Sequence, residues 1–383
     1  MAIETGHPMM AQMNHDEAAR DGFVLGLKHH LSSVVGPGNR PLYENRVRSK
    51  MRRSLGREPR DRHEVRGFME REPYHQAWGS LMRTAQEMMW NSVGASVDRQ
   101  IGGLIVKSKA RRSRLGSLRL DRDFRAPRYL TAIDHHGMPG SYLTDRTEDD
   151  VWAGAVYDRG AYIYQLGRAG GALMDGRGQA LVSYLYERRP DLAPRRILDM
   201  GCTIGNSTLA FVDEYHEAEV FGVEPGAPIL RYAHARAEHL GKRVHFSQQN
   251  AERTDFSDAS FDLVISLVML HETSAKALPN IFRECHRLLR PGGVMAHLEV
   301  PVRYKDMDYC DQVMRDWQTY YNDEPFWGQV CSTDLASLAK SSGFGDIEEG
   351  YQPTPATRGL REAGFTTTPH QSGGWWYVMS AVR

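Results

Sequence analysis

The feature that most constrains the fold of this 383-residue chain is an apolar segment that leads into a turn of small residues. Residues 196–208 read RILDMGCTIGNST, which predicts a strand, then a turn with Gly201 and Gly205, and then a helix beginning near Asn206. Glycine lets the backbone come close to a ligand, and the free N–H groups at the start of a helix favour ligand binding there. The segment therefore predicts a ligand-binding turn in an α/β fold.

The residues after this turn alternate between apolar strands and helices. Residues 218–223, AEVFGV, predict a second strand that ends at Glu224, about 25 residues after Asp199. A carboxylate at that position can accept hydrogen bonds from both hydroxyls of a ribose. Residues 261–270, FDLVISLVML, form a continuous apolar run, which is typical of a strand buried on both faces. Further strands are predicted at residues 244–247, 294–300, 346–350 and 375–382, and helices at residues 225–240, 277–289 and 333–343.

The order of these motifs resembles that of the class I S-adenosylmethionine (SAM)-dependent methyltransferases, whose first motif is an acidic residue followed by a glycine-rich turn. In this chain Asp199 precedes Gly201 and Gly205, and Thr203 stands where a middle glycine often lies. The FDLV…LLRPGG series is similar to the UbiE-like, or type 11, branch of that family. The resemblance implies a doubly wound, mostly parallel, seven-stranded Rossmann-like sheet that binds SAM and releases S-adenosylhomocysteine (SAH).

The resemblance also assigns residues to the cofactor. Glu224 is expected at the ribose, and the segment from Asn250 to Glu252 at the amino group of the adenine. Tyr157 lies where the family often has a lid helix over the cofactor, although core packing explains this tyrosine equally well. The expected cofactor-binding residues are Asp199, Gly201, Cys202, Thr203, Gly205, Asn206, Glu224, Pro225, Asn250, Ala251, Glu252, Leu267 and Tyr157.

Two residues directly after the strand at 261–270 are candidates for catalysis. His271 and Glu272 stand where ligands of doubly wound sheets bind, at the carboxyl ends of the strands. Methylation of a hydroxyl or an acidic carbon needs a base, and a histidine with an ordinary pKa can take a proton at neutral pH. We therefore expect His271, and after it Glu272, to act as the general base. The alternative is a histidine that positions the substrate or caps the next helix, with Glu272 in solvent.

The chain is longer than one doubly wound domain requires, so additional segments are expected. Residues 1–40 read as a polar tail, and residues 41–150 as a mainly helical region that completes the substrate pocket or forms a dimer contact. Residues 151–383 would form the methyltransferase domain, with a cap insertion at about 301–330. The aromatic side chains of that insertion suit an organic substrate, but packing against the helical region explains them equally well.

Charge and composition limit the partners of the chain. The net charge is zero, yet the first 130 residues hold 24 Lys and Arg against 14 Asp and Glu. No aromatic residues interleave with the densest basic run, residues 107–119, so a solvated helix face is favoured over a nucleic-acid site. His135 and His136 suggest a metal, but adjacent histidines tend to point apart, so no metal is expected and a substrate-facing or structural loop is favoured. No apolar run reaches the ~18 residues of a membrane span, and the N-terminus lacks a leader pattern, so a cytoplasmic location is expected.

Three functions are compatible with these observations. The favoured one is transfer of a methyl group from SAM to an oxygen or carbon of a small organic molecule, with a specialised metabolite as one candidate. The basic N-terminal segment keeps an RNA or protein methyltransferase in consideration. The third is a SAM-binding regulatory protein without catalysis, against which the complete turn at Gly201 and the acidic Glu224 argue.

Overall fold

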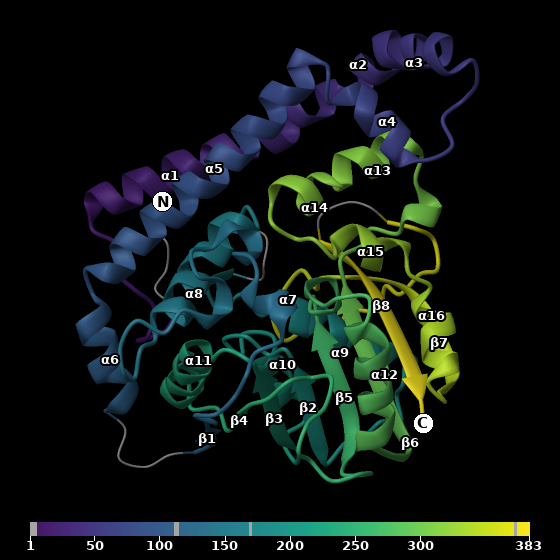
Figure 1. Ribbon diagram of the computed structural model, residues 1–383. Coiled ribbons are helices and arrows are strands. Elements are labelled where there is room, and N and C mark those ends of the chain that lie inside the picture. The colour runs from purple at the N-terminus through teal and green to yellow at the C-terminus, as the bar shows by residue number, and fades with distance from the viewer. Residues whose placement is uncertain (1–5, 111–114, 168–170, 371–373) are drawn as a thin grey trace.

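The computed structural model describes residues 6–110, 115–167, 171–370 and 374–383. These residues contain one eight-stranded sheet in the order β1-β4-β3-β2-β5-β6-β8-β7. Its first six strands in this order pair in parallel, and β8 runs antiparallel to both β6 and β7. The architecture is therefore the predicted α/β, mostly parallel, doubly wound sheet (Figure 1). The strands are β1 (Ser117–Arg119), β2 (Arg196–Met200), β3 (Glu219–Glu224), β4 (His245–Gln248), β5 (Phe261–Leu267), β6 (Leu289–Glu299), β7 (Gly345–Pro353) and β8 (Trp375–Val382).

The number of strands differs from the expected seven because β1 adds an edge strand beside β4. Ser117 lies opposite His245, and Arg119 lies opposite Ser247. This strand has only three residues, and its central Leu118 is flanked by exposed polar side chains. Such a segment has neither a long apolar run nor an extended alternation, so its sequence does not mark it as a strand.

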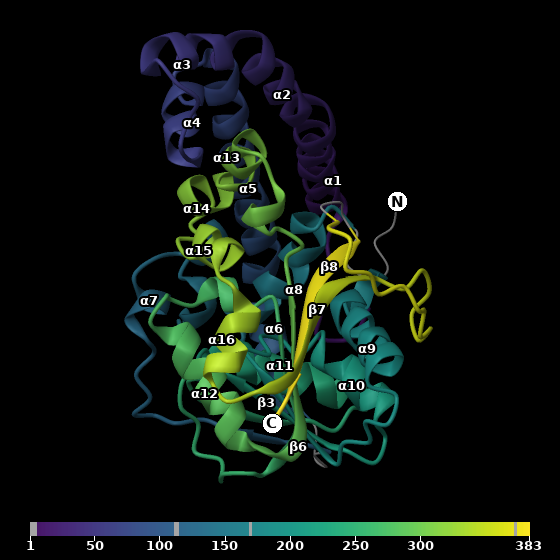
Figure 2. The same cartoon turned by 90° about the vertical axis from the view of Figure 1, so that its right-hand side faces the viewer.

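Helices cover both faces of the sheet and build two cores. One core lies between the sheet and α9, α10 and α11, with Leu181, Phe211 and Leu230 fully or almost fully buried. The other lies between the sheet and α12 and α16, around Phe282 and Leu335. Figure 2 shows these two groups of helices on opposite sides of the sheet. Their bounds are α9 (Gly176–Arg188), α10 (Thr208–Glu214), α11 (Ala227–His239), α12 (Ala277–Leu288) and α16 (Leu335–Ser341).

The N-terminal helices form a long arm that packs on the sheet domain through α8 (Trp152–Tyr164). In this arm α1 and α5 lie side by side (Figure 1). Met89 and Val93 of α5 share one buried cluster with Val156 of α8 and Ile229 of α11. The arm and the sheet domain therefore have a continuous apolar core. The other elements before the first motif are α1 (His15–His30), α2 (Asn39–Leu42), α3 (Arg48–Leu55), α4 (Arg62–Met69), α5 (Pro73–Asp98), α6 (Ile101–Lys109) and α7 (Arg128–Thr131).

An insertion after β6 fills the space between the arm and the sheet. It contains α13 (Tyr309–Arg315), α14 (Trp317–Tyr321) and α15 (Trp327–Ser332). Val313 packs with residues of α3 and α4, and the Asp316 carboxylate accepts a 2.7 Å hydrogen bond from Nε of Arg62. The aromatic insertion therefore does pack against the helical region, one of the two uses that its sequence suggested.

Among the described residues, no helix combines the length and the apolar character that crossing a membrane requires.

Candidate active site

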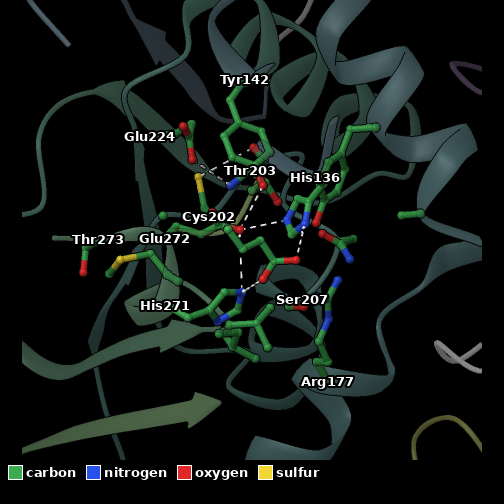
Figure 3. A pocket seen from close by; sticks show the side chains of 18 of the residues that line it. His136, Tyr142, Arg177, Cys202, Thr203, Ser207, Glu224, His271, Glu272 and Thr273 are labelled. Carbon is green, nitrogen blue, oxygen red and sulfur yellow. Dashed lines mark hydrogen bonds and ion pairs between the residues drawn. The ribbon is translucent and has the colours of Figure 1, made fainter. Parts of the chain in front are cut away.

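A cavity of about 350 Å³ lies at the carboxyl ends of β2, β3 and β5. Its walls come from the sheet, from α8, and from the insertion after β6. Figure 3 shows that His136, Tyr142, Glu224, His271 and Glu272 converge on it. The residues that sequence analysis predicted for the site line this cavity, with the exceptions of Gly205 and Glu252. The cavity therefore brings together residues that are distant in the sequence.

The turn after β2 has the backbone conformation that its glycines suggested. Gly201 has a φ of 72°, and a Cβ added there would lie 2.4 Å from Cγ of Met269. The left-handed φ and the close contact each disfavour a residue that has a Cβ atom. Thr203, which stands where a glycine is common, also adopts a left-handed φ of 45°. Gly205 lies behind this surface, where an added Cβ would be 3.1 Å from the ring of Phe246.

Glu224 ends β3 with its carboxylate directed at the same turn. Backbone N–H groups of Thr203 and Gly226 donate hydrogen bonds of 3.3 Å to its two oxygens. Burial raises the pKa of Glu224 to about 7. A ligand hydroxyl that donates to this carboxylate would stabilise its charged form.

Asp199 is the second buried carboxylate on this side of the cavity. Oγ1 of Thr208 donates a 2.6 Å hydrogen bond to Oδ2, while Oδ1 has no hydrogen-bond partner among the described residues. Burial raises its pKa to about 7 as well. A buried acceptor without a donor is costly, so a ligand that supplies one would be stabilised here. Two carboxylates beside an open glycine turn therefore fit a ligand that carries hydroxyl or cationic groups.

The segment that was expected at the adenine lines the cavity only in part. Asn250, Ala251 and Leu267 line the cavity. Glu252 does not, because its carboxylate accepts hydrogen bonds from the Tyr129 hydroxyl at 3.1 Å and from the Asn280 amide at 2.7 Å. Through these two hydrogen bonds, the side chain of Glu252 stabilises the wall of the cavity.

Four other predicted residues line the cavity around the turn. Cys202 and Thr203 belong to the turn itself, and Pro225 follows Glu224. Asn206 is buried, and its side-chain amide donates a 2.8 Å hydrogen bond to the backbone carbonyl of Met174. Tyr157 reaches the cavity from α8, the lid-helix position that the sequence suggested.

His271 lies on the short 3₁₀ turn that follows β5 and is held from behind by Glu299. The Nδ1 atom is 2.7 Å from a carboxylate oxygen of Glu299, which ends β6. Burial would lower the pKa of His271, but Glu299, Glu272 and Glu324 outweigh burial and raise it to about 9. His271 is therefore protonated at neutral pH, and its Nε2 edge is the one directed away from Glu299.

Glu272 is also buried in the structure. Its Oε1 atom lies 2.8 Å from Nε2 of His136 and accepts a 3.2 Å hydrogen bond from the Tyr142 hydroxyl. Burial would raise the pKa of Glu272, but His136, His271 and His135 hold it well below its usual range. A solvated Glu272, the alternative considered from sequence, does not occur.

Several residues of the site were not assigned from the sequence. Glu299, which holds His271 from outside the cavity, ends a strand and could have been proposed by the rule that suggested His271. Glu324 gave no such signal, because it belongs to an irregular segment between α14 and α15. His136 was not assigned a role of its own, because only its loop was favoured as substrate-facing or structural. Among the described residues, no group of three or more His, Cys, Asp and Glu has an arrangement that could hold a metal ion.

Aromatic residues form much of the remaining wall. The rings of Tyr142 and Tyr157 meet edge to face with centroids 6.1 Å apart, and His271 meets Trp327 in the same way at 5.2 Å. Since Trp327 belongs to the insertion, that segment lines the cavity as well as packing against the arm. The insertion therefore packs against the arm and also borders the cavity, and its contact with an organic substrate stays a prediction.

Comparisons with known proteins agree with this architecture. Residues 197–293 match the family model described as "Methyltransferase domain". The methyltransferase GfsG of Streptomyces halstedii is 32% identical over 188 residues, which is 46% of this chain and 64% of that protein. Demethylmenaquinone methyltransferase of Thermus thermophilus is 34% identical over 111 residues, or 28% of this chain and 49% of that protein.

Two further matches are to a much larger protein and to a solved structure. A highly reducing polyketide synthase, verA of Penicillium polonicum, is 26% identical over 46% of this chain and 7% of its own length. A solved structure of phosphoethanolamine N-methyltransferase 2 from Haemonchus contortus is 20% identical, with a TM-score of 0.42, and covers 60% of this chain and 58% of that one. This chain spans less than two thirds of the length of each of these relatives.

The order of the strands and the position of the cavity at their carboxyl ends are those of a Rossmann-like domain of the class I methyltransferase type. The matches show that residues 197–293 resemble a methyltransferase domain and that the chain is similar to named methyltransferases, among them the UbiE-like demethylmenaquinone methyltransferase, as its motifs predicted.

Proposed function

We propose that this protein transfers a methyl group from SAM to an oxygen or carbon atom of a small organic molecule. The observation that carries this proposal is one cavity that joins the glycine turn and Glu224 to His271 and Glu272. Its aromatic walls suit an organic acceptor. One relative is named as an O-methyltransferase of a biosynthetic pathway: the ubiquinone biosynthesis O-methyltransferase of Pseudomonas aeruginosa is 32% identical over 108 residues.

The cofactor half of the cavity would be the part around the first motif. When bound, SAM supplies an electrophilic methyl group on a positively charged sulfur. Glu224 would accept hydrogen bonds from the ribose hydroxyls, and Asn250 and Ala251 would border the adenine. Asp199 would supply a carboxylate near the turn, and Gly201 the close backbone approach. Cys202, Thr203, Asn206, Pro225, Leu267 and Tyr157 complete this half.

The proton of the acceptor would leave toward His271 and Glu272. Glu299 holds Nδ1 of His271, so Nε2 is the atom available to the acceptor. Only the neutral imidazole can take a proton, and the pKa of about 9 makes this form more abundant as the pH rises toward that value. Glu272 would stabilise the imidazolium that results.

The basic run near residue 110 supports a small acceptor over a nucleic acid. Its described members have acidic or carbonyl partners: Lys109 pairs with Asp149, Arg119 with Asp255, and Lys107 donates to the Pro8 carbonyl. Residues 111–114 lie outside the described part of the chain. We also propose residues 41–150 as the region that encloses the acceptor and residues 151–383 as the catalytic domain, and a homodimer stays a prediction. The expected tail at 1–40 is not a tail where the structure describes it, because α1 lies within it and Met9 and Val24 are buried against α5.

Calorimetry with SAH tests the cofactor assignment. The wild-type protein should bind one SAH per chain, and Glu224→Ala should weaken that binding while Glu217→Ala, at an exposed position, should not. Absence of SAH and SAM binding, or equal affinity in the Glu224→Ala variant, would show that the assignment is wrong.

A further inference from the structure

The acceptor half of the cavity contains a buried cluster that the general-base proposal does not use. His136 stands between two carboxylates: its Nε2 atom is 2.8 Å from Oε1 of Glu272, and its Nδ1 atom is 2.8 Å from Oε1 of Glu324. Because both ring nitrogens face carboxylates, both act as donors, and the ring carries a positive charge. His136 therefore fixes the two carboxylates relative to each other.

Glu324 is fully buried and uses only one of its oxygens. The Oε1 atom also accepts hydrogen bonds from the Tyr164 hydroxyl at 3.0 Å and from the Asn322 amide at 2.7 Å. The Oε2 atom has no hydrogen-bond partner among the described residues, although Glu324 lines the cavity. A buried carboxylate oxygen without a donor is costly, and it favours a ligand that supplies one.

The unused oxygen of Glu324 lies beside the catalytic edge of His271. Nε2 of His271 is 3.8 Å from Oε2 of Glu324 and 3.6 Å from Oε1 of Glu272, both too long for hydrogen bonds. Two hydroxyl groups on adjacent carbons lie close enough together for one to face Nε2 of His271 and the other to face Oε2 of Glu324. The three carboxylates of Glu272, Glu299 and Glu324 outnumber the two imidazolium rings, so an anionic group would be repelled here.

We propose that Glu324 is a second acceptor-binding residue and that the acceptor carries a hydroxyl group on the atom next to its methylated hydroxyl. This inference rests on the proposed methyltransferase function. The first hydroxyl donates to Nε2 of neutral His271, and its neighbour donates to Oε2 of Glu324. An acceptor with two neighbouring hydroxyls on a ring or a short chain has this arrangement, and the aromatic walls favour a ring.

The reaction itself leaves the neighbouring hydroxyl unchanged. The hydroxyl oxygen at His271 forms the new C–O bond with the methyl carbon as the C–S bond of the bound cofactor breaks, and the sulfur keeps the electron pair. The hydroxyl proton moves to Nε2 of His271. Glu324 selects and orients the acceptor but takes no proton.

A binding experiment with simple probes tests this assignment without knowledge of the natural acceptor. The SAH-loaded wild-type protein is titrated near pH 9, where the neutral form of His271 is populated, with 1,2-dihydroxybenzene, 1,4-dihydroxybenzene and 2-methoxyphenol, and binding is followed by calorimetry and by the ¹⁵N signals of the histidine rings. We expect 1,2-dihydroxybenzene to bind at least about tenfold tighter than either other probe, because only this probe can donate to both residues. It should also shift the signals of His271.

The variant Glu324→Gln replaces one carboxylate oxygen, a hydrogen-bond acceptor, with an NH₂ group, a donor. Its amide oxygen can still accept from Tyr164 and Asn322, while its NH₂ group replaces the free acceptor. We expect this variant to bind SAH normally but to lose the preference for 1,2-dihydroxybenzene. The same change at exposed Glu217 should preserve that preference.

Three results would overturn the proposal: equal affinity of the wild-type protein for the three probes, no binding of 1,2-dihydroxybenzene up to its solubility, or a preference that persists in Glu324→Gln. If that variant does not fold, the comparison of 1,2-dihydroxybenzene with 2-methoxyphenol in the wild-type protein decides. If the wild-type protein does not bind SAH at all, that result would instead contradict the methyltransferase function itself.

Discussion

At the scale of single residues, the site depends on carboxylates and imidazoles that are kept out of water. Burial raises the pKa values of Asp199 and Glu224 to about 7, while nearby carboxylates raise that of His271 to about 9. Groups that titrate this close to neutrality change their charge within the range in which most enzymes work. The charge state of the site should therefore control both cofactor affinity and turnover.

The first prediction concerns Glu224 and cofactor binding. The charged carboxylate accepts ligand hydroxyls better than the neutral form, so SAH affinity should rise as the pH increases through about 7. Replacement by Gln should weaken SAH binding about tenfold to hundredfold, as expected for a hydrogen bond to a charged group. Calorimetry from pH 5.5 to 8.5 measures both effects. A pH-independent affinity equal to that of the variant would contradict this role.

A second prediction follows from the raised pKa of His271. Below about pH 9 this side chain is mostly protonated, so its neutral form, and with it kcat, should increase with pH and level off near 9. His271→Ala should lower kcat by about 10²- to 10⁴-fold and abolish this pH dependence, with SAH affinity retained. A kcat profile that is flat between pH 6 and 9 in the wild-type enzyme would exclude His271 as the base.

The sequence could predict the cofactor half of this site better than the acceptor half. Asp199 and Gly201 lie at the end of β2 and Glu224 at the end of β3, two strands that follow one another along the chain. The contacts of Glu324 with His136 and with His271 join segments 188 and 53 residues apart. Such contacts arise from tertiary packing of irregular segments, which no local periodicity encodes.

At the scale of secondary-structure elements, the arm has a direct connection to the acceptor site. Side chains of α5 hold the loop that carries His136: Nε2 of Gln86 and Nε1 of Trp90 donate hydrogen bonds of 2.9 and 2.8 Å to its backbone carbonyl. His136 has a left-handed φ of 59°, a conformation that costs energy in a residue other than glycine. The two hydrogen bonds stabilise this conformation.

Replacement of Gln86 by Ala should therefore reduce turnover without affecting the cofactor site. The variant removes one of the two donors and also the partner of the buried Lys28 amine, so a loss of stability of about 1–3 kcal/mol should accompany it. Steady-state kinetics and SAH calorimetry separate the two effects. Gln76→Ala, an exposed change on the same helix, is the control. An unchanged kcat with unchanged His136 ring signals would contradict the connection.

The elements also differ in how well they could be predicted. Long apolar strands such as β5 are evident in the sequence because both of their faces are buried. The three-residue β1 was missed because its place in the sheet depends on pairing with β4. The packing of the insertion against α3 and α4 was foreseen only as one of two alternatives, since aromatic residues serve equally in cores and in pockets.

At the scale of the whole molecule, the arm, the sheet domain and the insertion surround one cavity. The apolar cluster that joins α5, α8 and α11 is continuous across the arm and the sheet domain. Segments that share one core tend to unfold together. The molecule should therefore behave as a cooperative unit in spite of its long arm.

Thermal unfolding tests this cooperativity. We expect a single transition, and SAH at 100 times its Kd should stabilise the whole chain by about 2.7 kcal/mol. Differential scanning calorimetry with and without SAH measures the effect. Two transitions, of which only one moves with SAH, would show that the arm is an independent unit.

Methyl transfer itself tests the proposed function most directly. The protein is incubated with [³H-methyl]-SAM and an extract of its source organism, and the label is followed in small-molecule, protein and RNA fractions, with His271→Ala as the control. We predict labelling of a small molecule, with most of the label lost in the variant. Label confined to RNA or protein, or equal labelling by His271→Ala, would contradict the proposed function and its base.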